Sequence, residues 1–238
     1  MSRWRGIAFR VLSVLFALLW LNVAFSEAAS GEGHTLHVVA FRYLFALLLL
    51  TMPALLQLFR AERKAAAMQL IVLAVTAHLM GTLIAPYLDP LAYGLVAIAV
   101  AMAWLHPARA EMFRTNFSLP LTILAAAGAL PLLGFVIDQA RLVRTDPSSH
   151  AVQGHWEDTA VFALALALAI ILASLRTRGW WIPAAAASLA TIAYGALSIL
   201  EPDQASSWGR AWGGAAIAWA VGFVAALVLV SGRRSAPR

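Results

Sequence analysis

The stretch HWEDTAVFALALALAIILASL (155–175) decides the fold class. HWED (155–158) directly precedes an apolar run that carries no charged side chain before Arg176. A bilayer core about 30 Å thick needs about 17 to 25 apolar residues in one helix, because every backbone N–H and C=O group must be satisfied within the segment. The run therefore predicts a transmembrane helix that begins beside a polar cluster.

The composition of the whole chain points the same way. Hydrophobic residues make up 62% of the sequence and charged residues 12%, whereas soluble domains are about 25% charged. The net charge is +6, but the basic residues form short clusters between apolar runs, which indicates membrane topology and not a nucleic-acid partner. The absence of cysteine excludes disulfides and cysteine-ligated metals. The frequent use of arginine and alanine favours a bacterial source and hence the bacterial cytoplasmic membrane.

Eight runs predict transmembrane helices, and together they leave no room for a soluble domain. We expect an all-α, polytopic bundle that forms one domain over residues 1–238. The predicted spans are about 6–26, 36–59, 67–88, 91–105, 118–137, 159–175, 181–200 and 212–231.

The arginines predict the orientation of the bundle. Positively charged short loops are retained on the cytoplasmic side. With both termini cytoplasmic, most loop arginines fall inside, and only Arg141, Arg144 and Arg210 fall outside. The alternative is that the first helix is a signal peptide cleaved near Ala28, which would leave seven spans.

Several function classes are excluded by missing residues. The sequence has no GxxxxGK[ST], HExxH or GxSxG motif. The only lysine, Lys64, lies in a predicted loop, so no intramembrane amine exists to bind retinal. We do not expect a bis-histidine haem, because no second histidine lies at the depth of His78.

Three polar residues are candidates for a pathway through the bilayer. Arg42 lies about two turns inside the second predicted helix, and an unpaired guanidinium is costly there. We expect an acidic partner for it, with Asp138 the first choice and Glu157 or Asp158 the alternatives; snorkelling to the outer interface is the simpler explanation. His78 lies near the centre of the third span, where an ionisable side chain indicates a proton relay or a hydrogen bond to a neighbouring helix.

HWED itself has two interpretations. As a helix start, it places Glu157 and Asp158 at the positive end of the helix dipole, with Trp156 in the interfacial aromatic belt. As a site, it adds imidazole and carboxylate groups that suit a divalent metal at the outer face. The candidate ligands are His37, His150, His155 and Asp158, and we expect His37, His155 and Asp158 to come within about one coordination sphere of each other.

Three functions remain open on this evidence. The first is transport of a small molecule or ion along a path that uses Arg42, His78 and Asp138. The second is a membrane-embedded enzyme with an outward-facing histidine–carboxylate site. The third is an accessory subunit or scaffold, for which the small-residue faces around Gly213, Gly214 and Gly222 offer contact to another subunit or a second copy.

Overall fold

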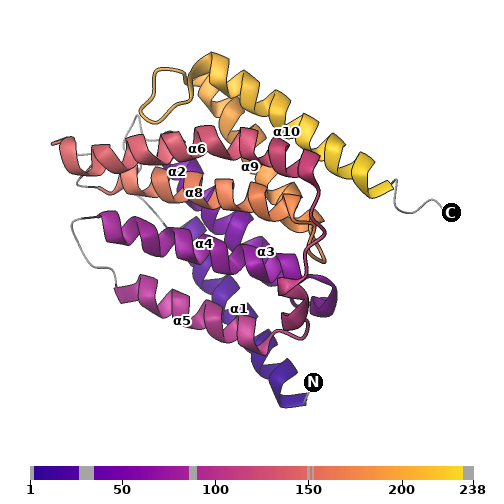
Figure 1. The fold of residues 1–238 in the computed structure, drawn as a ribbon. Coiled ribbons are helices and arrows are strands. Elements are labelled where there is room, and N and C mark those ends of the chain that lie inside the picture. Colours follow the sequence, from indigo (N-terminus) through magenta and orange to yellow (C-terminus); the bar gives the residue numbers. More distant parts are fainter. Residues whose placement is uncertain (1–2, 27–34, 86–89, 149–150, 152, 233–238) are drawn as a thin grey trace.

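The computed structural model describes residues 3–26, 35–85, 90–148, 151 and 153–232 (Figure 1). Within these residues, seven helices are long and apolar enough to cross a membrane, and an eighth is shorter. The chain is therefore an all-α, polytopic membrane bundle, as predicted. The long helices are α1 (Arg3–Phe25), a continuous helix made of α2 (Thr35–Val38), η1 (Val39–Thr51) and α3 (Met52–Leu56), α4 (Ala65–Ile84), α6 (Leu119–Thr145), α8 (His155–Ser174), α9 (Trp181–Leu200) and α10 (Gly209–Gly232). The shorter helix is α5 (Pro90–Leu105).

Most helix boundaries differ from the prediction by a few residues, and two of the differences lie at the histidine-containing end of the bundle. Helix α6 continues two turns past residue 137 to Thr145, and α8 begins at His155 and not at 159. Hydropathy marks the part of a helix inside the hydrocarbon, whereas both helices extend into the polar interface. HWED is consequently the first turn of α8.

Helix α8 is the central element of the bundle. It lies between α4 and α6, with α9 behind it (Figure 1). Of its most apolar stretch, 78% of the residues are buried, compared with 22% in α6 and in α10. A helix that is apolar on all sides suits such a core position. The exposed sides of α6 and α10 are left to face the lipid.

Glycines allow two pairs of helices to approach closely. A Cβ atom at Gly81 of α4 would lie 2.2 Å from Cγ2 of Val161 in α8. Gly195 of α9 and Gly213 of α10 face each other, and a Cβ on either would come within 3 Å of the other's carbonyl oxygen. Larger residues at these positions would push the helices apart.

The arginine-containing loops meet at one end of the bundle, which we call the arginine end. There Arg5 donates to the Trp104 carbonyl, the Ala66 N–H to the Arg178 carbonyl, and the Asn116 N–H to the Leu175 carbonyl. Both described chain ends also lie there (Figure 1). The opposite end, which we call the histidine end, carries His37 and His155.

Candidate functional site

The histidine end brings His37 and His155 into contact. Their rings stack with centroids 4.9 Å apart and an interplanar angle of 28°. His37 is 1% exposed, and the start of its helix is held by Gln204, whose side-chain oxygen accepts from the Leu36 N–H at 3.3 Å. This contact joins two members of the predicted His37–His155–Asp158 group, but these three described side chains do not form one group of potential metal ligands.

Thr159 determines which nitrogen of His37 carries a proton. The Thr159 hydroxyl lies 2.8 Å from Nδ1 of His37 and donates its only hydrogen to the His155 carbonyl at 2.8 Å. It can therefore only accept from His37, so Nδ1 of His37 is the N–H. In the neutral ring, Nε2 is therefore the nitrogen without a hydrogen. Sequence reasoning did not identify Thr159, because a threonine in an apolar run has no distinguishing pattern.

Trp156 and Asp146 form the wall beside His37. The indole packs edge-on against the imidazole of His37, with ring centroids 5.4 Å apart, and donates from Nε1 to Asp146 at 2.7 Å. Asp146 also accepts from the backbone N–H and hydroxyl of Ser148. The Trp156 side chain is packed inside the bundle and is not turned toward the lipid. Its place in the aromatic belt stays a prediction.

The two acids of HWED face different neighbours. Glu157 is 6% exposed and lies against Gly81 of α4, whose added Cβ would be 3.5 Å from its Oε1. Asp158 interacts electrostatically with Glu157 and with Arg42. Both acids lie in the first turn of α8, as the helix-start interpretation predicts, and the N-cap residue is Gly154 in a left-handed conformation.

Arg42 does not form the predicted ion pair with Asp138. Its guanidinium donates to the backbone carbonyl of Ser26, just past the end of α1. Asp138 instead lies 3.7 Å from Arg141, one turn further along α6, and both side chains are exposed. The last carbonyls of a helix have no intrahelical donor and carry partial negative charge. The end of α1 thus supplies Arg42 with an acceptor that hydropathy could not indicate.

His78 occupies an aromatic pocket within the membrane. Its ring centroid lies 5.6 Å from that of Trp20 on α1, 6.0 Å from that of Phe41 and 6.2 Å from that of Phe45, both on η1. Ring faces of this kind attract cations. His78 is six residues from Ile84, the end of α4, which corresponds to about 9 Å along the helix.

The segment that follows His37 and supplies Phe41 and Phe45 of this pocket is a π-helix. Residues Val39–Thr51 are wound more widely than an α-helix, and the Thr51 hydroxyl donates to the Ala46 carbonyl five residues earlier. Extended π segments are rare, and short ones often mark functional sites. Phe41, Arg42 and Phe45 all project from it.

The structure describes three of the four predicted metal ligands, namely His37, His155 and Asp158. His150 lies outside the described residues. Within the described ranges, no three histidine, aspartate or glutamate side chains are grouped to hold one ion. A metal at the histidine end stays a prediction.

At the arginine end, sequence reasoning missed a buried histidine. His106 is 1% exposed, accepts at Nδ1 from the Ala108 N–H, and donates from Nε2 to the side-chain oxygen of Gln57 at 3.1 Å. Burial lowers the pKa of His106 to about 4. Both ring nitrogens are committed to the protein, so we assign His106 a structural role.

No protein-family model, curated protein or solved structure matches the chain. Function is therefore inferred from the chemistry of the site itself.

Proposed function

We propose that this protein transports a small solute or ion across the membrane in exchange for, or together with, protons. The observation that carries the proposal is the position of His78. It is an ionisable side chain inside a span, and it packs against a π-helix and three aromatic rings. Ionisable groups at such depth are costly and usually serve a pathway.

The histidine end supplies the outer part of that pathway. His37 lies just before η1, Arg42 and Phe41 project from η1, and Phe41 contacts His78. Two imidazoles thus lie along this segment, His37 at its start and His78 of α4 beside Phe41, further toward the membrane interior. Imidazole suits this role because it gains and loses a proton near neutral pH, and Nε2 of His37 is the nitrogen with that capacity.

Proteoliposomes containing the purified protein and a pH-sensitive dye test the proposal. Amines, carboxylates and divalent cations are added outside in turn, and the internal pH is followed. We expect at least one class to change the pH, and the His78→Gln variant to reduce that rate at least tenfold. The matched control is Thr76→Val, on the exposed side of the same helix, where the hydroxyl bonds only to the Val72 carbonyl. Internal pH that stays at the protein-free rate for every class would overturn proton-linked transport.

A membrane-embedded metal enzyme is the second candidate, and one observation favours it. A metal-binding histidine commonly donates its second N–H to an oxygen acceptor, which fixes the ring, and the Nδ1–H of His37 donates to Thr159 in this way. Elemental analysis of the purified protein distinguishes the two. Stoichiometric zinc or copper that is lost in His37→Gln and His155→Gln would favour the enzyme, whereas a metal-free protein that changes vesicle pH would favour transport.

A further inference from the structure

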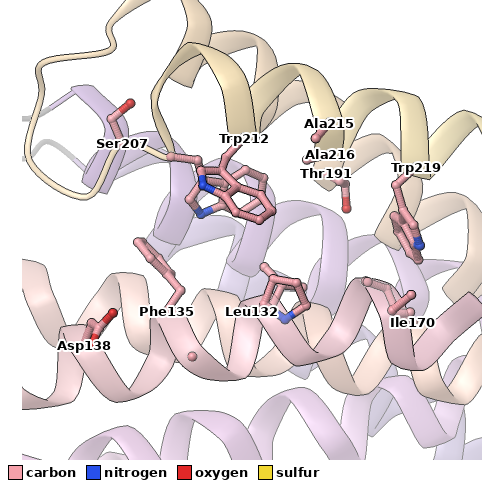
Figure 2. Close-up of a pocket in the computed structure, with 15 residues that line it drawn as sticks. Leu132, Phe135, Asp138, Ile170, Thr191, Ser207, Trp212, Ala215, Ala216 and Trp219 are labelled. Atoms are coloured by element: carbon pink, nitrogen blue, oxygen red, sulfur yellow. The ribbon is translucent and has the colours of Figure 1, made fainter.

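A groove between α6 and α10 lies apart from the histidine cluster. It has a volume of about 660 Å³, and its inner wall includes Ile170 of α8 and Thr191 of α9 (Figure 2). The volume falls in the range of about 300–1,000 Å³ that small-molecule sites occupy. Because α6 and α10 are among the least buried spans, the groove opens toward the lipid.

The groove is polar at one end and mainly apolar along the rest, where the Thr191 hydroxyl donates to the Ala187 carbonyl. Asp138 and Ser207 lie at the polar end, and the far end is closed by the indole of Trp219 (Figure 2). Trp219 is fixed in place, since Nε1 donates to the Leu124 carbonyl at 3.0 Å and the ring covers Gly128, where a Cβ atom would lie 2.3 Å from it. This polarity matches a molecule with a polar head and a hydrocarbon tail.

The length of the groove matches one leaflet of a bilayer. Asp138 and Gly128 are ten residues apart on α6, which corresponds to about 15 Å, half of a hydrocarbon core about 30 Å thick. A transmembrane helix from a second copy would be about 30 Å long and 10–12 Å wide, a volume of more than about 2,000 Å³. The groove therefore fits a hydrocarbon chain and is too small for a helix.

We propose that this groove binds one phospholipid of the leaflet at the histidine end, with a headgroup that carries both an ammonium and a phosphate. The hydrocarbon chain lies along the groove from Asp138 to Trp219. The Asp138 carboxylate faces the ammonium, and Arg141, whose guanidinium is 3.7 Å from it, faces the phosphate. This charge pattern favours phosphatidylethanolamine over the anionic phosphatidylglycerol.

The test fills the groove without disturbing the bundle. A Cβ atom at Gly134, which lines the groove, would meet nothing within 4 Å, so Gly134→Leu places its side chain in the lipid's space. Gly222→Leu is the control, because Gly222 is equally open, lies on α10 and does not line the groove. Ala215→Leu fills the groove from the α10 side and serves if Gly134→Leu does not fold.

Delipidated protein is titrated with phosphatidylethanolamine, and bound lipid is counted by native mass spectrometry. We expect one tightly bound lipid, at least tenfold weaker binding in Gly134→Leu, and no change in Gly222→Leu. Asp138→Asn should reduce the preference for phosphatidylethanolamine over phosphatidylglycerol severalfold. Equal binding of phosphatidylethanolamine by Gly134→Leu and Gly222→Leu would overturn the proposal. So would a wild-type dimer that binds no lipid and becomes monomeric in Gly134→Leu, because the occupant would then be a second copy.

Discussion

The contact between Gly81 and Val161 predicts a large effect from a single added methyl group. In Gly81→Ala the new Cβ would lie 2.2 Å from Cγ2 of Val161, about 1.3 Å less than a carbon–carbon contact of 3.5 Å. Val161 cannot rotate away easily, because a β-branched side chain in a helix has one strongly preferred rotamer. Helices α4 and α8 must therefore separate, and overpacking of this kind costs about 1–3 kcal/mol.

The cost is measured as the free energy of unfolding in detergent micelles containing increasing sodium dodecyl sulfate. The control is Gly94→Ala, because a Cβ atom at Gly94 meets nothing within 4 Å. We expect a gain of up to about 1 kcal/mol there, since alanine is more favourable than glycine within a helix. Val161→Ala removes the clashing methyl group, so the double variant should recover most of the loss caused by Gly81→Ala. Gly81→Ala that is as stable as Gly94→Ala, or a double variant without recovery, would refute the close packing of these helices.

Three further predictions concern charged or titratable groups. The pKa of His106 is lowered from 6.5 to about 4, so the unfolded chain takes up a proton first as the pH falls. The contribution of neutral His106 to the free energy of unfolding is complete above pH 6.5 and falls by up to about 3 kcal/mol between pH 6.5 and 4. Unfolding measured at each pH should show this loss in the wild type and not in His106→Gln. Arg42→Leu should cost about 1.5–3 kcal/mol, because it removes a charge-assisted hydrogen bond, whereas Arg141→Leu removes an exposed pair worth at most about 1 kcal/mol. Equal effects of the two changes in the same unfolding assay would contradict the contact of Arg42 with the end of α1. Asp158→Asn should change the free energy of unfolding by no more than about 0.5 kcal/mol, because repulsion from the adjacent Glu157 offsets what the Asp158 carboxylate gains from the dipole of α8 and from Arg42. A loss of more than about 1 kcal/mol would show that the dipole interaction dominates.

The sequence was sufficient to predict the spans but not the partners of their polar residues. Long apolar runs identify membrane helices because the bilayer requires them, and α9 begins and ends at the predicted residues. The meeting of His37 and His155 could be expected because both lie at span ends on one side. Asp158, an alternative partner expected for Arg42, does interact with it electrostatically. The Ser26 carbonyl that accepts from Arg42 could not be expected, because that contact depends on how α1 and η1 pack. The π-helix was also hidden, since a segment that is apolar on every side shows no period.

The Gly195–Gly213 contact has a consequence for how the groove can change. A Cβ at Gly195 would lie 2.9 Å from the Gly213 oxygen, and one at Gly213 would lie 2.6 Å from the Gly195 oxygen. Neither glycine lines the groove, yet together they set the distance between α9, which forms part of its back, and α10, which forms one side. Residues on the groove surface, such as Ala215 and Ala216, can vary without altering that spacing. The residues on the groove surface and the residues that set the α9–α10 distance are therefore different. Substitutions at Ala215 or Ala216 can change what the groove accepts, while Gly195 and Gly213 keep α9 and α10 at the same distance.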